Sequence, residues 1–234
     1  MVAVFMILSG AVARAMRILV IDVGGTHVKV LATGRKQPVK IPSGPHLTAG
    51  RMVSEVLKAT AGWNYSAVSI GYPGPAVQNR PLSEPANLGR GWVKFDYRKA
   101  FKCPVRIVND AAMQALGSYE GGRMLFLGLG TGLGSALILD GSLAPMELAH
   151  LPYRNSTFED YVGKRGLDRL GKKRWRRHVD EVVKEFKAAL VADYVVLGGG
   201  NAKLIKRPPP GARLGDNDNA FRGGFRLWDK SRSK

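Results

Sequence analysis

A strand–glycine turn–strand pattern occurs twice in this chain. The stretch VIDVGGTHVKV (20–30) ends one β-branched run on Asp22 and then turns through Gly-Gly-Thr into a second run. The stretch LFLGLGTGLGSALIL (125–139) repeats the pattern, with Thr131 in the place of Thr26. Two such units in one chain indicate a duplicated α/β fold. We therefore predict two lobes, each built on a sheet, with a cleft between them.

The predicted lobes cover residues 16–112 and 113–234, and the second lobe ends in a helix. With 45% hydrophobic residues among 234, the chain can build a core in each lobe. Residues 1–15 resemble a signal peptide in their apolar run, but no basic residue precedes that run, and it is too short to span a bilayer. Because Met16 comes directly before the first strand, we interpret residues 1–15 as an extension outside the fold.

Hydrophobic periodicity predicts the individual elements of both lobes. The hydroxyl of Thr48 suits the N-cap of the first helix. The last helix would carry Phe221, Phe225 and Trp228 toward a core. The predicted strands lie at 17–22, 27–33, 37–42, 66–71, 103–110, 123–129, 133–139 and 193–198. The predicted helices lie at 48–62, 111–119, 171–191 and 215–228, and a further helix is predicted to start after residue 200. A Pro/Gly-rich loop is predicted at 72–92.

The charge balance of the chain is strongly basic. There are 36 Lys and Arg residues against 18 Asp and Glu, which gives a formal net charge of +18. Ten of the basic residues lie between Lys164 and Lys187. Such a surface can bind a nucleic acid, an anionic membrane or another polyanion, and charge alone does not choose among them.

The chain has a single cysteine, Cys103. It excludes an intrachain disulfide and any zinc site that needs several cysteines. Low cysteine usage favours a reducing compartment, so we expect a cytoplasmic protein.

Three glycine-rich turns directly follow predicted strands, at 24–26, 128–134 and 198–200. Glycines leave backbone N–H groups open to an approaching anion, so such turns can bind phosphates. Any one of them could equally be a plain hairpin or strand-to-helix turn, but three in one chain favour phosphate binding. None is a P-loop, because no Gly-Lys-Ser/Thr follows, and the strand after 128–134 excludes a dinucleotide-binding turn.

Two carboxylates end predicted strands. Asp22 could position a metal-bound water beside donor phosphates. Asp110 could cap the helix that follows it, or it could take the proton from an attacking hydroxyl. Besides such a base, phosphoryl transfer mainly needs positioning of the reactants and neutralisation of charge. Glu147 and His150 make no metal site without further ligands, but both can hydrogen-bond the hydroxyls of a sugar.

An ordered set of motifs runs through the chain: IDVGGTHVK, NDA, GLGTGLGSAL, ELAHL and LGGGNAK. In this order, from about Arg17 to Trp228, they resemble the ROK family of sugar kinases (repressor, open reading frame, kinase), within the actin-like ATPase superfamily. The stretches GKKRWRRHVD and PPPGARLGDNDNAFRGGFRLW are similar to the polyphosphate glucokinase branch of that family. The resemblance implies a two-lobed actin-like ATPase fold, a duplicated ribonuclease H-like unit, that closes over a sugar.

The resemblance also implies roles for particular residues. Asp110 would be the general base on the sugar 6-hydroxyl, and Asp22 would hold Mg²⁺ through a water. The sugar would contact Asn87, Asn109, Asp110, Glu147, His150 and, on a looser alignment, Glu159. The donor phosphates would face Gly24, Gly25, Thr26, Lys29, Gly130, Thr131 and Gly132, and a nucleotide would pack on Gly198, Gly199 and Gly200.

The chain departs from the family pattern in three places. No cysteine-rich motif follows His150, so we predict no structural zinc. Only residues 1–15 precede Met16, so we expect no DNA-binding domain of the kind that ROK repressors carry. Ala149 stands where the family has glycine. A homodimer is expected from the resemblance alone.

We therefore predict a kinase that phosphorylates the 6-hydroxyl of glucose, with polyphosphate as donor, ATP as a further donor and Mg²⁺ as cofactor. Polyphosphate would follow a basic track of Lys172, Lys173, Arg174, Arg176 and Arg177, with Lys164, Arg165 and Arg169 beside it; the alternative is a solvated helix face. Two other functions stay open, namely an ATP-dependent kinase for another hexose and a protein that binds polyanions or nucleic acid without turnover. Because no recognisable nucleic-acid module or complete membrane-targeting pattern is present, neither is an expected partner.

Overall fold

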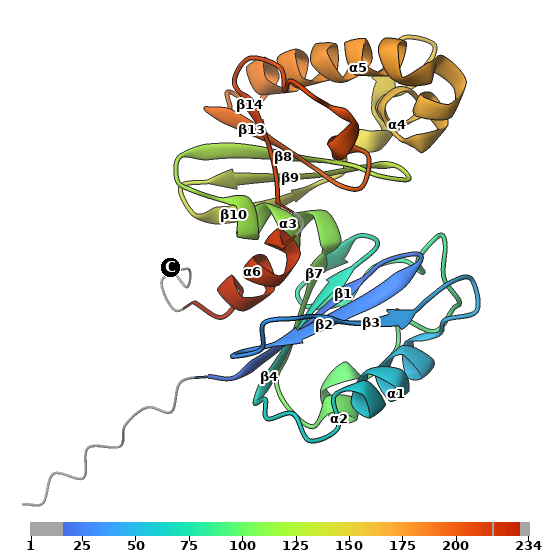
Figure 1. Cartoon of the computed structure of the whole chain (residues 1–234), viewed down its shortest axis with the longest axis vertical. Helices are drawn as coiled ribbons and strands as arrows, with labels where there is room; N and C mark the ends of the chain where they lie inside the picture. Colours follow the sequence, from blue (N-terminus) through green and yellow to red (C-terminus); the bar gives the residue numbers. More distant parts are fainter. Residues whose placement is uncertain (1–15, 217, 230–234) are drawn as a thin grey trace, which may run out of the picture.

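The computed structural model describes residues 16–216 and 218–229, so the predicted extension over 1–15 lies outside the described residues. Two lobes are stacked on one another, with sheets and helices in alternating layers (Figure 1). From one end to the other, the layers are α5, the second sheet, α3 with α6, the first sheet, and α1 with α2. Helices thus cover both faces of each sheet, which is why the inner strands are apolar along almost their whole length.

The first sheet has the strand order β3-β2-β1-β4-β7. Its central strand β1 (Ile18–Val23) pairs antiparallel with β2 (His27–Ala32) and parallel with β4 (Ala67–Tyr72). The edge strands are β3 (Val39–Pro42) and β7 (Val105–Asn109).

The second sheet has the strand order β10-β9-β8-β13-β14. Here β8 (Arg123–Leu129) pairs antiparallel with β9 (Leu133–Leu139) and parallel with β13 (Tyr194–Gly198). The edges are β10 (Ser142–Met146) and β14 (Ala212–Leu214). Strand for strand, this order and these directions repeat the first sheet. The predicted duplicated fold is confirmed.

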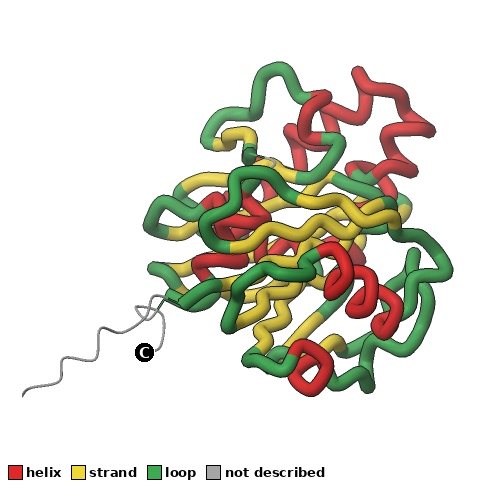
Figure 2. The backbone as a smooth tube through the Cα atoms, turned by 60° about the horizontal axis from the view of Figure 1, so that its bottom comes forward, coloured by secondary structure: helices red, strands yellow, loops and turns green. Residues whose placement is uncertain are grey.

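The outer helices pack on the far faces of the two sheets (Figure 2). These are α1 (Ala49–Ala59) and α2 (Tyr97–Phe101) in the first lobe, and α4 (Phe158–Val162) and α5 (Lys164–Ala189) in the second. The predicted N-cap of α1 is confirmed, because the Thr48 hydroxyl accepts a hydrogen bond from the N–H of Arg51 at 3.3 Å. Among the described residues, no helix combines the length and apolar character needed to cross a membrane.

Three local features differ from the sequence expectations. Helix α5 consists of two helical segments joined by a kink at Gly171, where φ is 72°, a conformation that glycine adopts at little cost; the predicted helix over 171–191 matches the second segment, and the segment from Lys164 to the kink was not predicted. The helix predicted after β13 is a single 3₁₀ turn, η2 (Ala202–Leu204). The N-cap of the helix after β7 is Asn109, so the capping alternative for Asp110 falls away.

Two short hairpins were too brief for periodicity to predict. One is β5 (Ala76–Val77) with β6 (Arg80–Pro81), inside the long Pro/Gly-rich loop. The other is β11 (Pro152–Tyr153) with β12 (Ser156–Thr157), which follows the 3₁₀ turn η1 (Leu148–His150).

The central layer consists of α3 (Asp110–Ser118) and α6 (Asn219–Arg226). One face of α3 packs on the second sheet, where Ala115 and Phe126 share a buried cluster. Phe221 of α6 lies in a second buried cluster with Val20 of the first sheet, and Phe225 and Trp228 pack against that cluster. The predicted final helix is therefore confirmed. The predicted lobe boundary at 112/113 falls within α3.

Glycines let α3 and α6 approach very closely. A β-carbon added at Gly117 would meet the backbone of Asn219, and one added at Gly223 would meet the backbone of Met113. Because the obstacle in each case is main chain, the helices would have to separate to admit a methyl group. This crossing fixes the spacing between the two sheets.

We expect Gly223→Ala to lower the free energy of unfolding by about 1–3 kcal/mol, the usual cost of overpacking a close-packed contact. The matched control is Gly50→Ala in α1, where the added carbon would make an ordinary 3.6 Å contact with Phe95. The control should be neutral or stabilising because alanine favours helix. Urea denaturation of both variants measures this, and equal stabilities would contradict the proposed crowding at the crossing.

Candidate active site between the two lobes

A cavity of about 310 Å³ lies between the lobes and is lined by both. Most of the candidate site residues meet there although they come from distant parts of the sequence. The predicted residues that line it are Gly24, Gly25, Asn87, Asp110, Gly130, Thr131, Gly132, Glu147, His150, Glu159 and Gly199. A volume of this size falls at the lower end of the range for small-molecule sites.

Asp110 enters the cavity from the junction of β7 and α3. The preceding residue, Asn109, caps the helix: its Oδ1 accepts hydrogen bonds from the N–H groups of Ala111 at 2.9 Å and Ala112 at 3.2 Å. Its Nδ2 donates to the carbonyl oxygen of Gly74 at 3.0 Å, which ties the cap to the loop after β4. Asp110 is therefore the first residue of the helix, with its carboxylate held at a fixed point.

The carboxyl group of Asp110 has a raised pKa. Burial raises its pKa to about 7, and the negative charges of Asp22 and Glu147 add to that rise, while a hydrogen bond from the N–H of Ala111 opposes it. A base with a pKa near the working pH is well matched to accept a proton from a hydroxyl group. Two partly buried carboxylates, of which one raises the pKa of the other, are typical of functional sites.

Asp22 is the second-to-last residue of β1 and does not line the cavity. Burial raises its pKa, whereas the ammonium of Lys29 on β2, with Nζ 3.7 Å from Oδ2, opposes the rise. The register explains the pair, because Asp22 and Lys29 are directly opposed across the two strands. Among the described residues, no group of three or more Asp, Glu, His or Cys side chains could hold a metal ion on its own.

The two glycine turns face the cavity from opposite lobes. In each turn the first glycine uses its own N–H internally: Gly24 donates to the carbonyl of His27 at 3.0 Å, and Gly130 donates to the carbonyl of Gly132 at 3.1 Å. The following N–H groups, of Gly25 and Thr26 in one turn and of Thr131 and Gly132 in the other, have no acceptor among the described residues. These are the donors that the turns can offer to an anion.

Polar side chains gather at the second-lobe side of the cavity. Glu147 follows β10, His150 ends η1, and Glu159 lies in α4. The His150 Nδ1 lies 3.8 Å from Oε1 of Glu159, and the same oxygen is 3.5 Å from a guanidinium nitrogen of Arg165. A β-carbon on Gly132 would overlap Glu159, so the glycine makes room for that carboxylate beside the turn. Several acceptors and donors around one space suit a polyhydroxylated ligand.

Not every predicted site residue lines the cavity. Asn109 is the helix cap, Asp22 and Lys29 lie on β1 and β2, and Thr26 belongs to the first turn without lining the cavity. Of the third glycine turn only Gly199 reaches it, with φ at 79°. That turn is tied to the second one, because Nδ2 of Asn201 donates to the carbonyl of Gly130 at 3.0 Å. The basic track on α5 lies outside the cavity lining: Lys172, Lys173, Arg174, Arg176 and Arg177.

Sequence reasoning missed Gln114, which lines the cavity one helical turn after Asp110. No hydrogen bond of its side-chain amide is formed within the described part of the chain. The i to i+4 spacing on a predicted helix was the available signal, since it puts both side chains on one face. Pro73 and Pro85, from the long loop, also line the cavity and were not predicted.

The raised pKa of Asp110 predicts a pH-dependent effect on stability. In the folded protein the pKa of Asp110 is about 7, against 3.8 for the ordinary group. The stability that its protonated carboxyl group contributes to the fold is therefore fully present below pH 4 and is lost as the pH rises through 7. Asp110→Asn should therefore gain stability relative to the parent between pH 4 and 7, by a few kcal/mol at most, since one pKa unit corresponds to about 1.4 kcal/mol. Urea denaturation at pH 4.5 and pH 8 measures the difference. An equal effect of the substitution at both values would show that Asp110 titrates normally.

Comparison with known proteins identifies the family of the chain. The model of the ROK family matches residues 18–145. The polyphosphate glucokinase of Mycobacterium leprae (strain TN) is 26% identical over 212 residues, which cover 80% of this chain and 64% of that protein. The polyphosphate glucokinase of Mycobacterium tuberculosis (strain H37Rv) is 28% identical over 81% of this chain and 80% of its own length. The chain thus spans less than two thirds of the first relative and four fifths of the second.

Solved structures support the fold. An inorganic polyphosphate/ATP-glucomannokinase from Arthrobacter sp. strain KM superposes with a TM-score of 0.76 at 23% identity, covering 89% of this chain and 96% of that one. A ROK family glucokinase from Streptomyces griseus, solved with glucose and AMPPNP, superposes with a TM-score of 0.69 at 19% identity, covering 90% and 98%. Since the family model matches more than half of the chain and the fold is the actin-like ATPase fold, this protein belongs to the ROK family.

Proposed function

We propose that this protein is a sugar kinase that transfers a phosphoryl group to the 6-hydroxyl of glucose, with inorganic polyphosphate as donor and ATP as a second donor. The observation that carries the proposal is Asp110, a base with a pKa near 7 in a cavity lined by glycine turns of both lobes. The similarity to polyphosphate glucokinases supports the choice of sugar and donor.

In this proposal the sugar lies against the polar side of the cavity. Asn87, Glu147, His150 and Glu159 bind its hydroxyl groups and orient the reacting one toward Asp110. The carboxylate of Asp110 accepts the hydroxyl proton while the oxygen attacks the terminal phosphorus of the donor. Asn109 holds Asp110 in place through the helix cap, and a contact from it to the sugar stays a prediction.

The donor phosphates lie between the two glycine turns. The free N–H groups of Gly25, Thr26, Thr131 and Gly132 bind the phosphate oxygens and stabilise the charge that shifts onto the leaving group. Mg²⁺ usually binds one or two carboxylates together with water and phosphates, and the two buried carboxylates fit that donor set. Asp22 would hold the ion through water, and the ion would neutralise charge on the donor.

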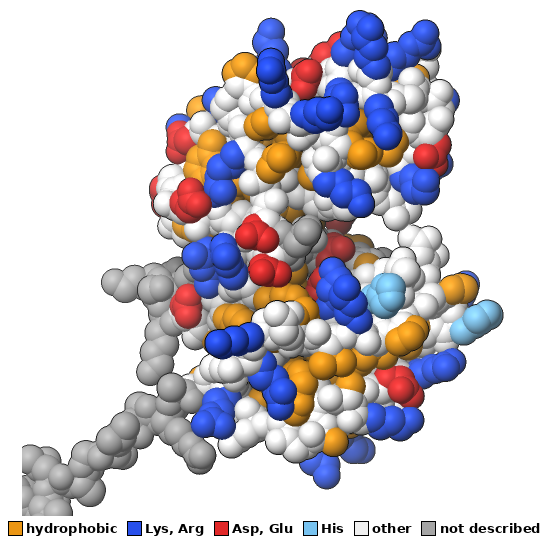
Figure 3. All heavy atoms as spheres, in the orientation of Figure 1, with side chains coloured by type: hydrophobic (Ala, Val, Ile, Leu, Met, Phe, Trp, Pro, Cys, Tyr) orange, Lys and Arg blue, Asp and Glu red, His pale blue; other side chains and the backbone are white. Residues whose placement is uncertain are grey.

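Helix α5 gives the donor a path away from the cavity. It begins at the second glycine turn, where the N–H of Lys164 donates to the carbonyl of Thr131 at 3.1 Å. Further along, Lys172, Lys173, Arg174 and Arg177 form no ion pair with a described carboxylate. Several Lys and Arg side chains lie over this helix at the top of Figure 3. Unpaired cations along one helix favour a long polyanion as the donor.

The third glycine turn favours ATP as the alternative donor. Asn201 ties this turn to the second one, so a nucleotide on Gly199 would be adjacent to the phosphate-binding N–H groups. The second candidate function is therefore an ATP-dependent hexokinase. A binding protein without turnover is less well supported, because Asp110, Glu147 and His150 all line the cavity. A cytoplasmic homodimer stays a prediction.

The proposed base is tested by Asp110→Asn. Loss of general-base catalysis should lower kcat by about 10²–10⁴-fold or more. The Kd for glucose, measured by calorimetry, should stay within a few fold of the parent value. In the parent protein, kcat/KM should rise with pH up to about 7, because Asp110 must be ionised to accept the proton. Near-normal turnover of the variant would place the base elsewhere.

The donor is tested by measuring glucose 6-phosphate formation from polyphosphate and from ATP in parallel, with Mg²⁺. Lys172→Ala/Lys173→Ala/Arg174→Ala should raise the KM for polyphosphate about tenfold or more and leave the KM for ATP and glucose unchanged, because the track contacts only the long donor. The matched control, Lys36→Ala/Lys40→Ala/Arg51→Ala, removes the same charge from exposed positions of the first lobe. An unchanged KM for polyphosphate would reject the track, and turnover with ATP alone would favour the second candidate function.

A further inference from the structure

A second large hollow lies on the outer edge of the first sheet, away from the cavity between the lobes. We name it the β7 groove; it has a volume of about 800 Å³, and its walls are the segments 78–81, 93–98 and 104–107 together with Trp228. None of these residues lines the candidate active site. The groove is therefore a separate feature that the proposed kinase reaction does not use.

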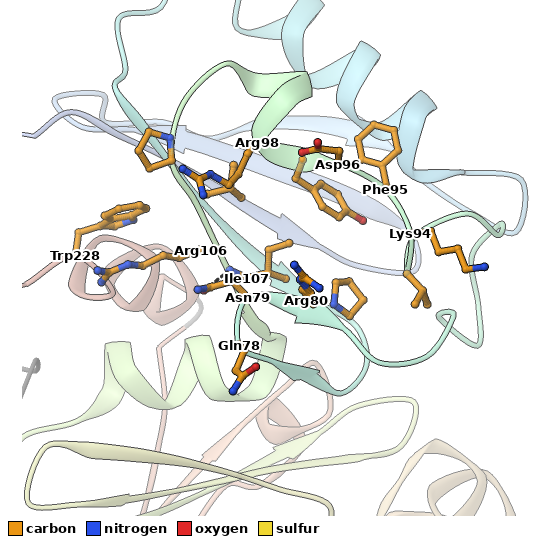
Figure 4. Close-up of a pocket in the computed structure, with 15 residues that line it drawn as sticks. Gln78, Asn79, Arg80, Lys94, Phe95, Asp96, Arg98, Arg106, Ile107 and Trp228 are labelled. Atoms are coloured by element: carbon orange, nitrogen blue, oxygen red, sulfur yellow. Dashed lines mark hydrogen bonds between the residues drawn. The ribbon is translucent and has the colours of Figure 1, made fainter.

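Three arginines from three different elements surround the groove. Arg80 comes from β6, Arg98 from α2 and Arg106 from β7 (Figure 4). Lys94 also contributes to the lining, but its side chain points away at the far end of the groove. Asp96 is the one acidic residue in the lining, and its carboxylate already accepts a hydrogen bond from the N–H of Lys99 at 3.0 Å as the cap of α2.

The three guanidinium groups lack acidic partners. Within the described residues none of them forms an ion pair, whereas Arg123, Arg154, Arg165, Arg213 and Arg222 each pair with a carboxylate. Cations that surround one hollow without counter-charges favour the binding of an anion there. The groove thus carries positive charge with which no described carboxylate forms an ion pair.

Arg106 is fixed in place before any ligand arrives. Its guanidinium carbon lies 4.4 Å from the ring centroid of Trp228, and one of its nitrogens donates to the carbonyl of Leu227. The indole N–H of Trp228 in turn donates to the hydroxyl of Ser69 at 2.8 Å, which anchors the ring to β4. A guanidinium that is already oriented loses less entropy when it binds an anion.

The β5–β6 hairpin adds neutral donors to the same wall. Gln78 and Asn79 form its turn with φ of 49° and 62°, a left-handed conformation that is costly for glutamine. Oδ1 of Asn79 accepts a hydrogen bond from the N–H of Ile107 at 3.2 Å, so this side chain covers the open edge of β7. The amide nitrogen of Asn79 is left available to a ligand with many acceptor oxygens, whereas the side chain of Gln78 points away from the three arginines (Figure 4).

We infer that the β7 groove is a second anion site, which binds a linear oligophosphate of at least three phosphates outside the catalytic cavity. Guanidinium groups match phosphate oxygens bidentately, and three of them on separate elements suit a chain better than a single small anion. The bound chain would contact β7 only a few residues before Asp110, and it would also contact the segment that follows α6. For a long polyphosphate, a second contact of this kind would raise its effective concentration at the protein.

The test follows the indole N–H of Trp228 by ¹H–¹⁵N NMR of the full chain during titration with tripolyphosphate, with Trp228→Phe to assign the signal. We expect a saturable shift in the parent protein. In Arg80→Ala/Arg98→Ala, the Kd should rise tenfold or more. The matched control Lys36→Ala/Lys40→Ala removes the same charge from the same lobe and should keep the parent Kd. Because both groove arginines that are replaced are exposed, the variant should fold normally, which an unchanged Tm verifies.

A stationary Trp228 signal, or an equal loss of affinity in the groove variant and the control, would overturn the proposal. Titrations with ATP, glucose 6-phosphate and inorganic phosphate identify the source of the phosphates. Tighter binding of tripolyphosphate than of the other three supports a bare phosphate chain, and tighter binding of any other anion overturns that assignment. None of these readouts depends on turnover, so failure of the proposed kinase activity would leave this test intact.

Discussion

The close crossing of α3 and α6 holds the two lobes in register. Glycines at the crossing let the two backbones touch, and Arg226 of α6 donates to the carbonyls of Leu116, Gly117 and Tyr119, which closes the C-terminal end of α3. The other end of α3 carries Asp110. The position of the candidate base relative to both glycine turns therefore depends on a helix that is packed against both sheets.

The same arrangement accounts for the electrostatics of the site. Because β1 and β7 are both in the first sheet and β4 separates them, Asp22 and Asp110 come close at the same end of parallel strands. Burial and mutual repulsion disfavour two ionised carboxylates there, and the pKa of Asp110 rises as a result. A group that costs stability when ionised is well suited to accept a proton during catalysis.

The large positive charge of the chain is divided between the two lobes. One part lies on α5 and starts at the second glycine turn, and another part surrounds the β7 groove. These surfaces differ in construction. The track on α5 consists of basic side chains of one helix, most of them exposed, with Arg176 partly buried and bonded to the carbonyl of Leu204. The groove instead combines three elements and a fixed arginine–tryptophan pair. This difference is why we treat the groove as a separate binding site.

The sequence determined the repeating units of the fold. The alternation of apolar runs with glycine turns located the strands of both sheets, and Thr48 and Phe221 were placed correctly because capping and amphipathicity are local properties. The glycine turns, Asp110 and Glu147 also followed from the residue pattern, since they lie where glycines and polar residues end apolar strands, whereas Asn87 and Glu159 came only from the family resemblance.

Only the tertiary structure decided how these turns meet. The hydrogen bond from Asn109 to the loop after β4, the contribution of Gln114 to the cavity and the fixed position of Arg106 depend on neighbours far apart in the sequence. No local pattern could reveal that α6 returns to cover the first sheet, because its glycines have meaning only against the backbone of α3. Local interactions thus specified the elements of this protein, and long-range packing determined the chemistry of the space between them.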